Sequence, residues 1–206
     1  MHSPLNKRLP RELRNNLGKY LGIFLLMGIA IAMTSGFLVA ASSIQKITEE
    51  VPETYHVEDG RFATAFEADD ATLAAVEELG CTVYPNFSCD LPLFVPTSDD
   101  ELTVRLIKNR TDVNFAVYAE GEAPASSDEI ALDRAFCANN GLSVGDEVKV
   151  AGKSLVISGI MTLPDDVASF MNNSDLVFNE LTLAYAQVTP EAYDDLAAGG
   201  SIFTYS

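Results

Sequence analysis

The stretch Tyr20-Leu-Gly-Ile-Phe-Leu-Leu-Met-Gly-Ile-Ala-Ile-Ala-Met-Thr-Ser-Gly-Phe-Leu-Val-Ala-Ala-Ser-Ser-Ile-Gln45 determines how the rest of the chain is organised. It carries no charged side chain over 26 positions. A helix rises about 1.5 Å per residue, so about 20 residues cross the roughly 30 Å of membrane hydrocarbon. Its leucine, isoleucine, phenylalanine and valine side chains together favour insertion by about 3–6 kcal/mol. We therefore predict a transmembrane helix over residues 20–45.

A cleaved signal peptide is the alternative interpretation of this stretch. Val39, Ala40 and Ala41 include the small residues that a cleavage site needs. The apolar core of a signal peptide is, however, only about 7–15 residues long. The length of the apolar run therefore favours a retained membrane helix.

Charge differs sharply between the two sides of this helix. Residues 1–19 contain five Lys or Arg residues and one acidic residue, Glu12, whereas the whole chain has a net charge of −17. By the positive-inside rule, the basic segment stays in the cytoplasm and the residues after about 46 lie outside the cell membrane. The acidic part argues against nucleic acid as a partner.

The cytoplasmic segment itself, residues 1–19, has helical spacing. Leu9, Leu13, Leu17 and Tyr20 fall on one face of a helix that begins near Pro10. Such a helix would lie on the inner surface of the lipid bilayer. A plain basic flank that only fixes the topology is the alternative.

After the membrane span, helical spacing continues to Val51 and Pro52 ends this helix, which predicts a stalk over residues 46–57. An extracytoplasmic core domain follows over residues 58–206. A helix begins at the cap Asp69 or Asp70, another covers Asp133 to Asn140 and ends at Gly141, and a third follows the cap Thr189. Residues 97–101 form a polar turn. The predicted strands are 60–66, 81–84, 91–95 (interrupted by Pro92), 102–108, 130–132, 148–150, 155–160, 175–178 and 183–188.

These elements predict an α+β fold, with one N-terminal transmembrane helix followed by a mixed, strand-rich domain. No internal sequence repeat is visible. Residues 201–206 have the pattern of a strand that is just beginning. We therefore expect that the core domain is incomplete at its C-terminal end.

Nothing in the sequence indicates a catalytic, nucleotide or metal site. Gly152-Lys153-Ser154 resembles the end of a phosphate-binding loop, but the glycine that this loop needs five positions earlier is Glu147. The tripeptide also lies between two predicted strands, so we expect a hairpin there. His2 and His56 would lie on opposite sides of the membrane, which excludes a zinc site with two histidines. We expect neither enzyme activity nor a cofactor, and we interpret the acidic pairs as caps and solvated turns.

The three cysteines leave two interpretations open. Cys81 and Cys89 can form a disulfide in an oxidising compartment, which would leave Cys137 free. Three small buried thiols are the interpretation that we favour.

Small residues recur at every fourth position of the predicted membrane helix, at Gly28, Ala32, Gly36 and Ala40. They form one narrow stripe along it. In lipid, close packing across small residues promotes helix association. We expect this stripe to contact another membrane helix of the same protein or of a partner, although chance can also produce such spacing.

The second half of the chain contains a series of short motifs whose residues include Asn114, Gly121, Pro124, Glu129, Gly141, Gly145, Asp146 and Gly159. In order and spacing, this series resembles the extracytoplasmic core domain of FtsX/MacB-type ABC-transporter permeases. The segment Leu13-Arg-Asn-Asn-Leu17-Gly18-Lys-Tyr20 is similar to the start of the same family. By residue type, the residues of the core-domain motifs are turn glycines and polar anchors of loops, not a ligand site.

The resemblance implies that the chain is the N-terminal portion of a permease subunit. A separate ATPase subunit would hydrolyse ATP in the cytoplasm and drive export or movement of the outer domain. The chain stops before the later membrane helices of this family, so it does not form a complete transporter half alone. The alternative is a membrane-anchored binding or adhesion module without transport activity.

Overall fold

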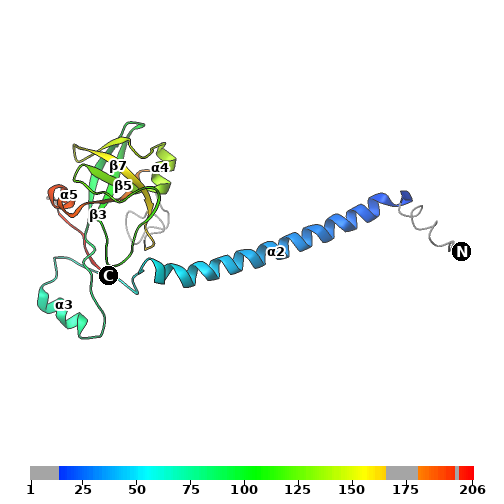
Figure 1. The fold of residues 1–206 in the computed structure, drawn as a ribbon, viewed down its shortest axis with the longest axis horizontal. Coiled ribbons are helices and arrows are strands. Elements are labelled where there is room, and N and C mark those ends of the chain that lie inside the picture. Colours follow the sequence, from blue (N-terminus) through cyan, green and yellow to red (C-terminus); the bar gives the residue numbers. More distant parts are fainter. Residues whose placement is uncertain (1–13, 166–180, 198–199) are drawn as a thin grey trace. The chain divides into compact units, whose positions relative to one another are not determined.

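The structure, a computed structural model, describes residues 14–165, 181–197 and 200–206 (Figure 1). The chain divides into two units, Met1–Glu50 and Val51–Ser206. As predicted, the fold is α+β: one long apolar helix precedes a mixed, strand-rich domain. Most of the predicted cytoplasmic segment, and the predicted strand 175–178, lie outside the described residues.

The long helix α2 (Leu17–Thr54) has the length and the apolar composition of a membrane span, and none of its residues is buried. Its 38 residues correspond to about 57 Å, more than the roughly 30 Å of a bilayer core. Thr34 and Ser35 donate hydrogen bonds from their hydroxyl groups to the carbonyl oxygens of Ala30 and Ile31, at 2.9 and 2.8 Å. These polar groups are therefore satisfied inside the helix, as a hydrocarbon environment requires.

The prediction that Pro52 ends this helix is wrong, because the helix continues to Thr54. Pro52 has no N–H group to donate to the preceding turn. Carbonyl groups at this end still accept, however, since Tyr55 N–H bonds to Val51 and Val57 N–H bonds to Pro52, at 3.0 Å each. The predicted membrane span and most of the predicted stalk therefore form one continuous helix.

Seven strands of the second unit form one sheet, and six of them close into a barrel. The strands are β2 (Ser88–Val95), β3 (Ser98–Lys108), β4 (Val117–Gly121), β5 (Glu129–Asp133), β6 (Glu147–Val150), β7 (Lys153–Thr162) and β8 (Leu183–Val188). Their order is β4-β7-β5-β8-β3-β2-β6, and a further β6–β7 pairing closes the ring. The β3–β8 and β5–β7 pairs are parallel, and the others are antiparallel. The seventh strand, β4, pairs with the same edge of β7 as β6 does, further along β7.

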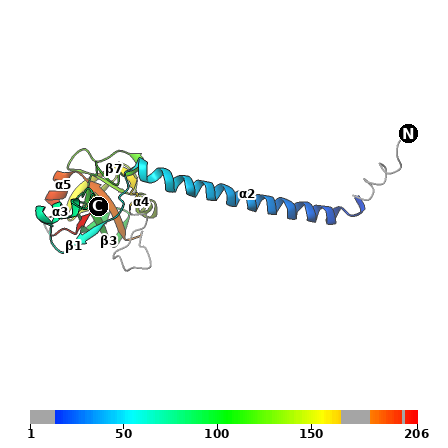
Figure 2. The same cartoon turned by 90° about the horizontal axis from the view of Figure 1, so that it is seen from below.

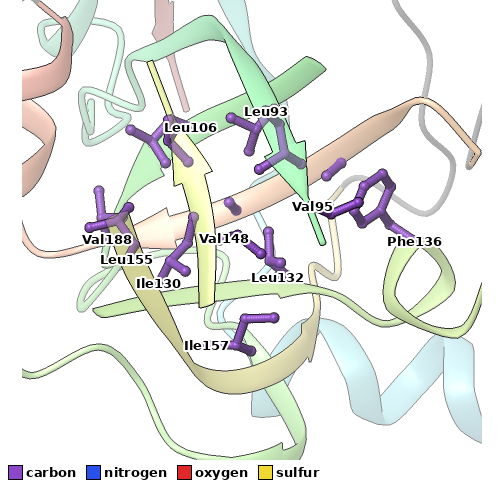
Figure 3. Packing of buried hydrophobic residues seen from close by; sticks show 14 of the residues in the cluster. Leu93, Val95, Leu106, Ile130, Leu132, Phe136, Val148, Leu155, Ile157 and Val188 are labelled. Carbon is purple, nitrogen blue, oxygen red and sulfur yellow. The ribbon is translucent and has the colours of Figure 1, made fainter. Parts of the chain in front are cut away.

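The main hydrophobic core fills this barrel (Figure 3). Alternate residues of each strand point inward, so β8 places Ala184, Ala186 and Val188 in the main core while Leu183 and Tyr185 belong to a second cluster on the other face. The labelled core residues include Leu93, Leu106, Ile130, Leu132, Val148, Leu155 and Ile157, all at most 1% exposed.

Two short helices cover the barrel. α4 (Arg134–Asn140) follows β5 and buries Phe136 and Cys137, and α5 (Pro190–Leu196) follows β8 and buries Ala192 and Tyr193. Because β5 and β8 are antiparallel, these helices leave opposite ends of the barrel, as Figures 1 and 2 show. The predicted cap Thr189 is confirmed, since its side chain accepts a hydrogen bond from the first turn of α5. Asp133, predicted as the first residue of α4, is instead its cap and accepts from the N–H group of Phe136.

The barrel has an internal repetition of topology that the sequence does not reveal. In the first half, the β2–β3 hairpin is followed by β5 and α4; in the second, the β6–β7 hairpin is followed by β8 and α5. The third strand of each half pairs in parallel with the second hairpin strand of the other half. The two halves are therefore interlocked, and neither can bury its apolar face alone.

A smaller lobe contains strand β1 (Phe62–Thr64), helix α3 (Asp70–Glu77) and strand β9 (Phe203–Tyr205). β1 and β9 form an antiparallel pair. Phe62 stacks on Tyr205 at 5.1 Å, and Phe87 meets Tyr205 edge-on at 5.4 Å. The predicted cap Asp69 is confirmed, since its side chain accepts from the N–H group of Thr72.

Several local predictions are wrong. Residues 81–84 form no strand; Tyr84 N–H bonds to Ser206, but only an isolated bridge at Pro85 follows. Pro92 does not interrupt β2. The N–H group that proline lacks would point towards β6, and it would lie beyond the two residue pairs of the β2–β6 ladder, so no hydrogen bond of that ladder is lost. The turn predicted over 97–101 is shorter, because β3 already begins at Ser98. Strand β4 was not predicted, whereas the strands at 102–108, 130–132, 148–150, 155–160 and 183–188 are confirmed.

Candidate functional site

The segment that directly follows the long helix is fixed to the loop between β3 and β4. The N–H group of Asn114 donates to the carbonyl oxygen of His56, and that of Phe115 donates to Tyr55, both at 2.9 Å. The rings of His56 and Phe115 lie 4.7 Å apart. Backbone hydrogen bonds and a ring contact therefore hold the chain at the point where α2 ends.

Asn114 is the central residue of this contact. Its side chain is fully buried, and its backbone is left-handed, with φ 53°. Its carbonyl Oδ1 accepts from the N–H group of Glu58 at 2.9 Å, and its Nδ2 donates to Glu58 Oε2 at 2.7 Å. A carboxamide supplies the acceptor and the donor together, which explains why an asparagine suits this position.

Ion pairs extend this contact to the end of β7. Arg61 Nε lies 2.5 Å from Glu58 Oε1, and Arg61 Nη2 donates to the carbonyl oxygen of Asp165 at 2.9 Å. Arg110 Nη1 lies 2.7 Å from Asp165 Oδ1. The side chains of Asp165 and Arg110 are only 1% and 8% exposed. Breaking a buried ion pair by removing one partner typically costs about 3–5 kcal/mol.

We call Glu58, Arg61, Arg110, Asn114 and Asp165 the junction. Its members come from three separate places in the chain: the segment after α2, the β3–β4 loop and the residues after β7. The junction therefore links these three segments through hydrogen bonds and ion pairs, of which the Arg110–Asp165 pair is the most buried. A displacement of the segment after α2 would therefore move the β3–β4 loop with it.

A groove of about 370 Å³ lies beside the junction, between the small β1–β9 sheet and the outer face of β3 and β8. Four members of the junction line it, Asn114 being the exception, together with Arg105 and Tyr185. Arg105 forms two 2.7 Å hydrogen bonds with the carboxylate of Asp90, which raise the pKa of its guanidinium further above its usual range. We call this hollow the junction groove.

The other residues of the family resemblance lie in tight loops around β4, β5 and β7. Glu129 accepts from the N–H group of Ala125 at 2.7 Å, and Asp146 accepts from that of Ser143 at 2.8 Å. The carbonyl oxygen of Pro124 accepts from the side chain of Asn109 at 2.8 Å. Gly141 and Gly145 have φ angles of 65° and 95°, and Gly121 and Gly159 face each other across the β4–β7 ladder. Of the eight residues that carry the resemblance, Asn114 is thus the one that belongs to the junction.

The stripe of small residues in α2 contacts nothing among the described residues. A Cβ atom added at Gly28 or Gly36 would have no heavy atom of another part of the chain within 4 Å. Ala32 and Ala40 are likewise exposed. The stripe is therefore available to another helix.

The Gly-Lys-Ser segment forms the predicted hairpin between β6 and β7. Ala151 and Gly152 form its turn, with φ angles of 49° and 88°, and Lys153 already belongs to β7. Lys153 Nζ lies 3.7 Å from Asp195. No helix begins after this turn, so the backbone geometry differs from that of a phosphate-binding loop.

The cysteines differ from the favoured interpretation in one respect. All three are free, and Cys89 and Cys137 are buried, but Cys81 is exposed. Burial raises the pKa of Cys89 to about 11 and that of Cys137 to about 12. Within residues 14–165, 181–197 and 200–206, no three His, Cys, Asp or Glu side chains are grouped as metal ligands.

The sequence pointed to Asn114 but not to its partners. Arg61 and Arg110 stand out only after folding, when they converge on Asp165 from 104 and 55 positions away. Asp165 appeared in the sequence as a member of an acidic pair and in the Pro164-Asp165 motif of the family resemblance, with no indication of its partners. The one local signal that could have drawn attention to these arginines was that basic residues are few after the membrane helix.

No protein-family model matches the sequence, and no curated protein matches it. Several solved structures are similar in part. The periplasmic region of MacB from Actinobacillus actinomycetemcomitans is 12% identical, with a TM-score of 0.42, over 68% of this chain and 64% of that one. The extracellular domain of the noncanonic ABC-type transporter YknZ from Gram-positive bacteria is 11% identical, with a TM-score of 0.40, over 72% and 73%.

A domain of a protein described as a permease, from Porphyromonas gingivalis, is 11% identical, with a TM-score of 0.37, over 59% of both chains. The present chain thus spans less than two thirds of the MacB region and of the Porphyromonas domain. At these identities and TM-scores, the similarities do not assign a function.

Proposed function

We propose that the chain is the N-terminal portion of an ABC-transporter permease subunit. In this proposal α2 crosses the cell membrane with its N-terminus in the cytoplasm, and the residues after about 46 are extracytoplasmic. A separate ATPase subunit hydrolyses ATP, and the membrane helices pass the resulting motion to the outer domain. The chain itself has no catalytic activity and no cofactor.

The observation that carries this proposal is the junction at the end of a continuous helix. A simple membrane anchor needs only a flexible link to its outer domain. Here the segment after α2 is held by Asn114 and by the Glu58–Arg61–Asp165–Arg110 ion pairs instead. Contacts that fix the segment after α2 to the outer domain support a role in mechanical coupling across a membrane.

The first experiment tests the topology with a native residue. Cys81 is the exposed thiol, while Cys89 and Cys137 are buried. A membrane-impermeant maleimide should label the protein in intact cells, and Cys81→Ser should abolish the labelling. Labelling of Cys81 only after the membrane is permeabilised would mean that the orientation is inverted.

The second experiment tests the coupling itself. The full-length protein, purified in nanodiscs with its ATPase subunit, should retain that subunit and support ATP hydrolysis and transport. Asn114→Ala should reduce transport per ATP hydrolysed, whereas Lys149→Ala, on the outer surface of β6, should not. If no ATPase subunit co-purifies with the wild-type protein, the transporter assignment fails and a binding or adhesion module is favoured.

A further inference from the structure

We propose that the junction groove binds a ligand carrying an oxyanion, a phosphate or a carboxylate. The first argument is the distribution of charge. Residues 51–206 contain only seven Lys or Arg residues. Three of them, Arg61, Arg105 and Arg110, come from different segments and line this one groove.

The second argument is which charged groups the groove presents. The carboxylates that line it, Glu58 and Asp165, have side chains only 8% and 1% exposed. The side chain of Arg61, by contrast, is 39% exposed. The two carboxylates are therefore much less accessible than the guanidinium group of Arg61.

The third argument concerns Arg110, which lines this groove and also a smaller neighbouring one. Its side chain is 8% exposed, and within the described part of the chain only its Nη1 has a partner, Asp165. A guanidinium carries five N–H donors in a fixed fork that matches an oxyanion. Its remaining donors are not among the fully buried unpaired atoms, so they are accessible from one or both of these hollows.

The groove also has a suitable size and lining. Its volume of about 370 Å³ falls in the range of small-molecule sites, which is about 300–1,000 Å³. The hydroxyl group of Tyr185 lies 3.4 Å from Arg105 Nη1, and the side chains of Phe62 and Ile202 provide apolar surface. A bound oxyanion would compete with Asp165 for Arg110, which places the ligand directly on the junction.

The test is a titration of the full chain in nonionic detergent with inorganic phosphate at constant ionic strength, measured by equilibrium dialysis. We expect saturable binding of one phosphate per chain. Arg110→Gln should weaken the binding at least tenfold. Lys149→Gln, which removes a cation outside the groove, should leave it unchanged. Far-UV circular dichroism shows that each variant is folded.

We expect Asp165→Asn to change the affinity for phosphate in the opposite direction. This change removes the carboxylate that competes for Arg110, so phosphate should bind several-fold more tightly. No saturable binding up to about 10 mM phosphate, or equal affinity of the wild type and Arg110→Gln, would overturn the proposal. Unchanged or weaker binding by a folded Asp165→Asn would also overturn it.

A competition arm distinguishes the source of the oxyanion. Displacement of phosphate by dihexanoyl phosphatidylglycerol, but not by the zwitterionic dihexanoyl phosphatidylcholine, would indicate an anionic lipid headgroup. Phosphate binding without displacement by either lipid would indicate a soluble oxyanion. Both results support the site. None of these measurements needs an ATPase, so failure of the site and failure of the transporter proposal are separate results.

Discussion

Gly121 on β4 and Gly159 on β7 lie opposite each other in an antiparallel ladder, and neither position has room for a side chain. A Cβ atom on Gly121 would lie 2.1 Å from the carbonyl oxygen of Ser158. One on Gly159 would lie 2.5 Å from that of Glu122. The N–H group of Glu122 donates to the same Ser158 oxygen at 3.0 Å. The two glycines thus allow the backbones of β4 and β7 to approach closely.

We predict that Gly159→Ala destabilises the domain by about 2–3 kcal/mol, because the clash is with backbone atoms that cannot rotate away. Gly159 does not have a positive φ, so the cost is steric alone. Gly60→Ala is the matched control, since its φ is also not positive and no atom lies within 4 Å. It should change stability by less than about 0.5 kcal/mol. Urea unfolding in detergent measures both, and equal effects would refute the steric explanation.

Asn114 provides the second prediction. In Asn114→Asp, the Nδ2 donor is replaced by an oxygen that faces Glu58 Oε2, which now lies 2.7 Å from Nδ2. Two carboxylates at that distance repel each other, so Asn114→Asp should destabilise the domain more than Asn114→Ala does at pH 7. The difference should shrink towards pH 4, because protonation of the new acid restores a donor. Thermal unfolding across this pH range checks it, and a difference that does not depend on pH would contradict this account.

The sequence predicted the elements whose signals are local. Helix ends depend on a few neighbouring residues, and the predicted caps Asp69 and Thr189 and the predicted helix end at Gly141 are all confirmed. Strands with alternating apolar residues, such as 102–108 and 183–188, were equally visible because each has one face in the core. The β6–β7 hairpin followed from a two-residue turn between two such strands.

Closure of the barrel and assembly of the junction depend on partners that are distant in the sequence. Strand β4 escaped prediction because most of its residues are partly or fully exposed, which leaves no apolar alternation. Asn114 and Glu58 are 56 positions apart, and nothing local to either residue identifies the other. The apolar segment 20–45 was the strongest signal, yet its spacing did not show that the helix continues past Pro52.

The buried thiol of Cys137 predicts a loss of stability at alkaline pH. Burial raises its pKa from 9.0 to about 12, so the folded state keeps the proton while the unfolded state loses it. The contribution of this thiol to the free energy of unfolding is fully present below pH 9. It decreases between pH 9 and 12, by about 1.4 kcal/mol per pH unit. Cys137→Ala should therefore unfold more easily at pH 7 but lose less stability between pH 9 and 11. Cys81→Ala, which removes an exposed thiol, should have the same slope as the wild type.

The last prediction concerns the stripe of small residues along α2. Gly28, Ala32, Gly36 and Ala40 are all exposed, and no described residue packs on them. In lipid there is little hydrophobic force between helices, so van der Waals packing across small side chains contributes much of the attraction. A leucine in the stripe would keep the backbones apart. It would not impair insertion, because leucine favours the membrane.

Gly36→Leu should therefore weaken assembly of the full-length protein with its partner subunits while leaving the protein in the membrane fraction. Ile31→Leu is the matched control, because it places the same side chain elsewhere on α2 and keeps the position large and apolar. Crosslinking and co-purification measure assembly, and membrane fractionation measures insertion. If Gly28→Leu, Ala32→Leu and Gly36→Leu all assemble as well as the control, the stripe makes no helix contact. The chain would then use α2 only as an anchor, and the coupling that we propose would have to pass through other parts of the protein.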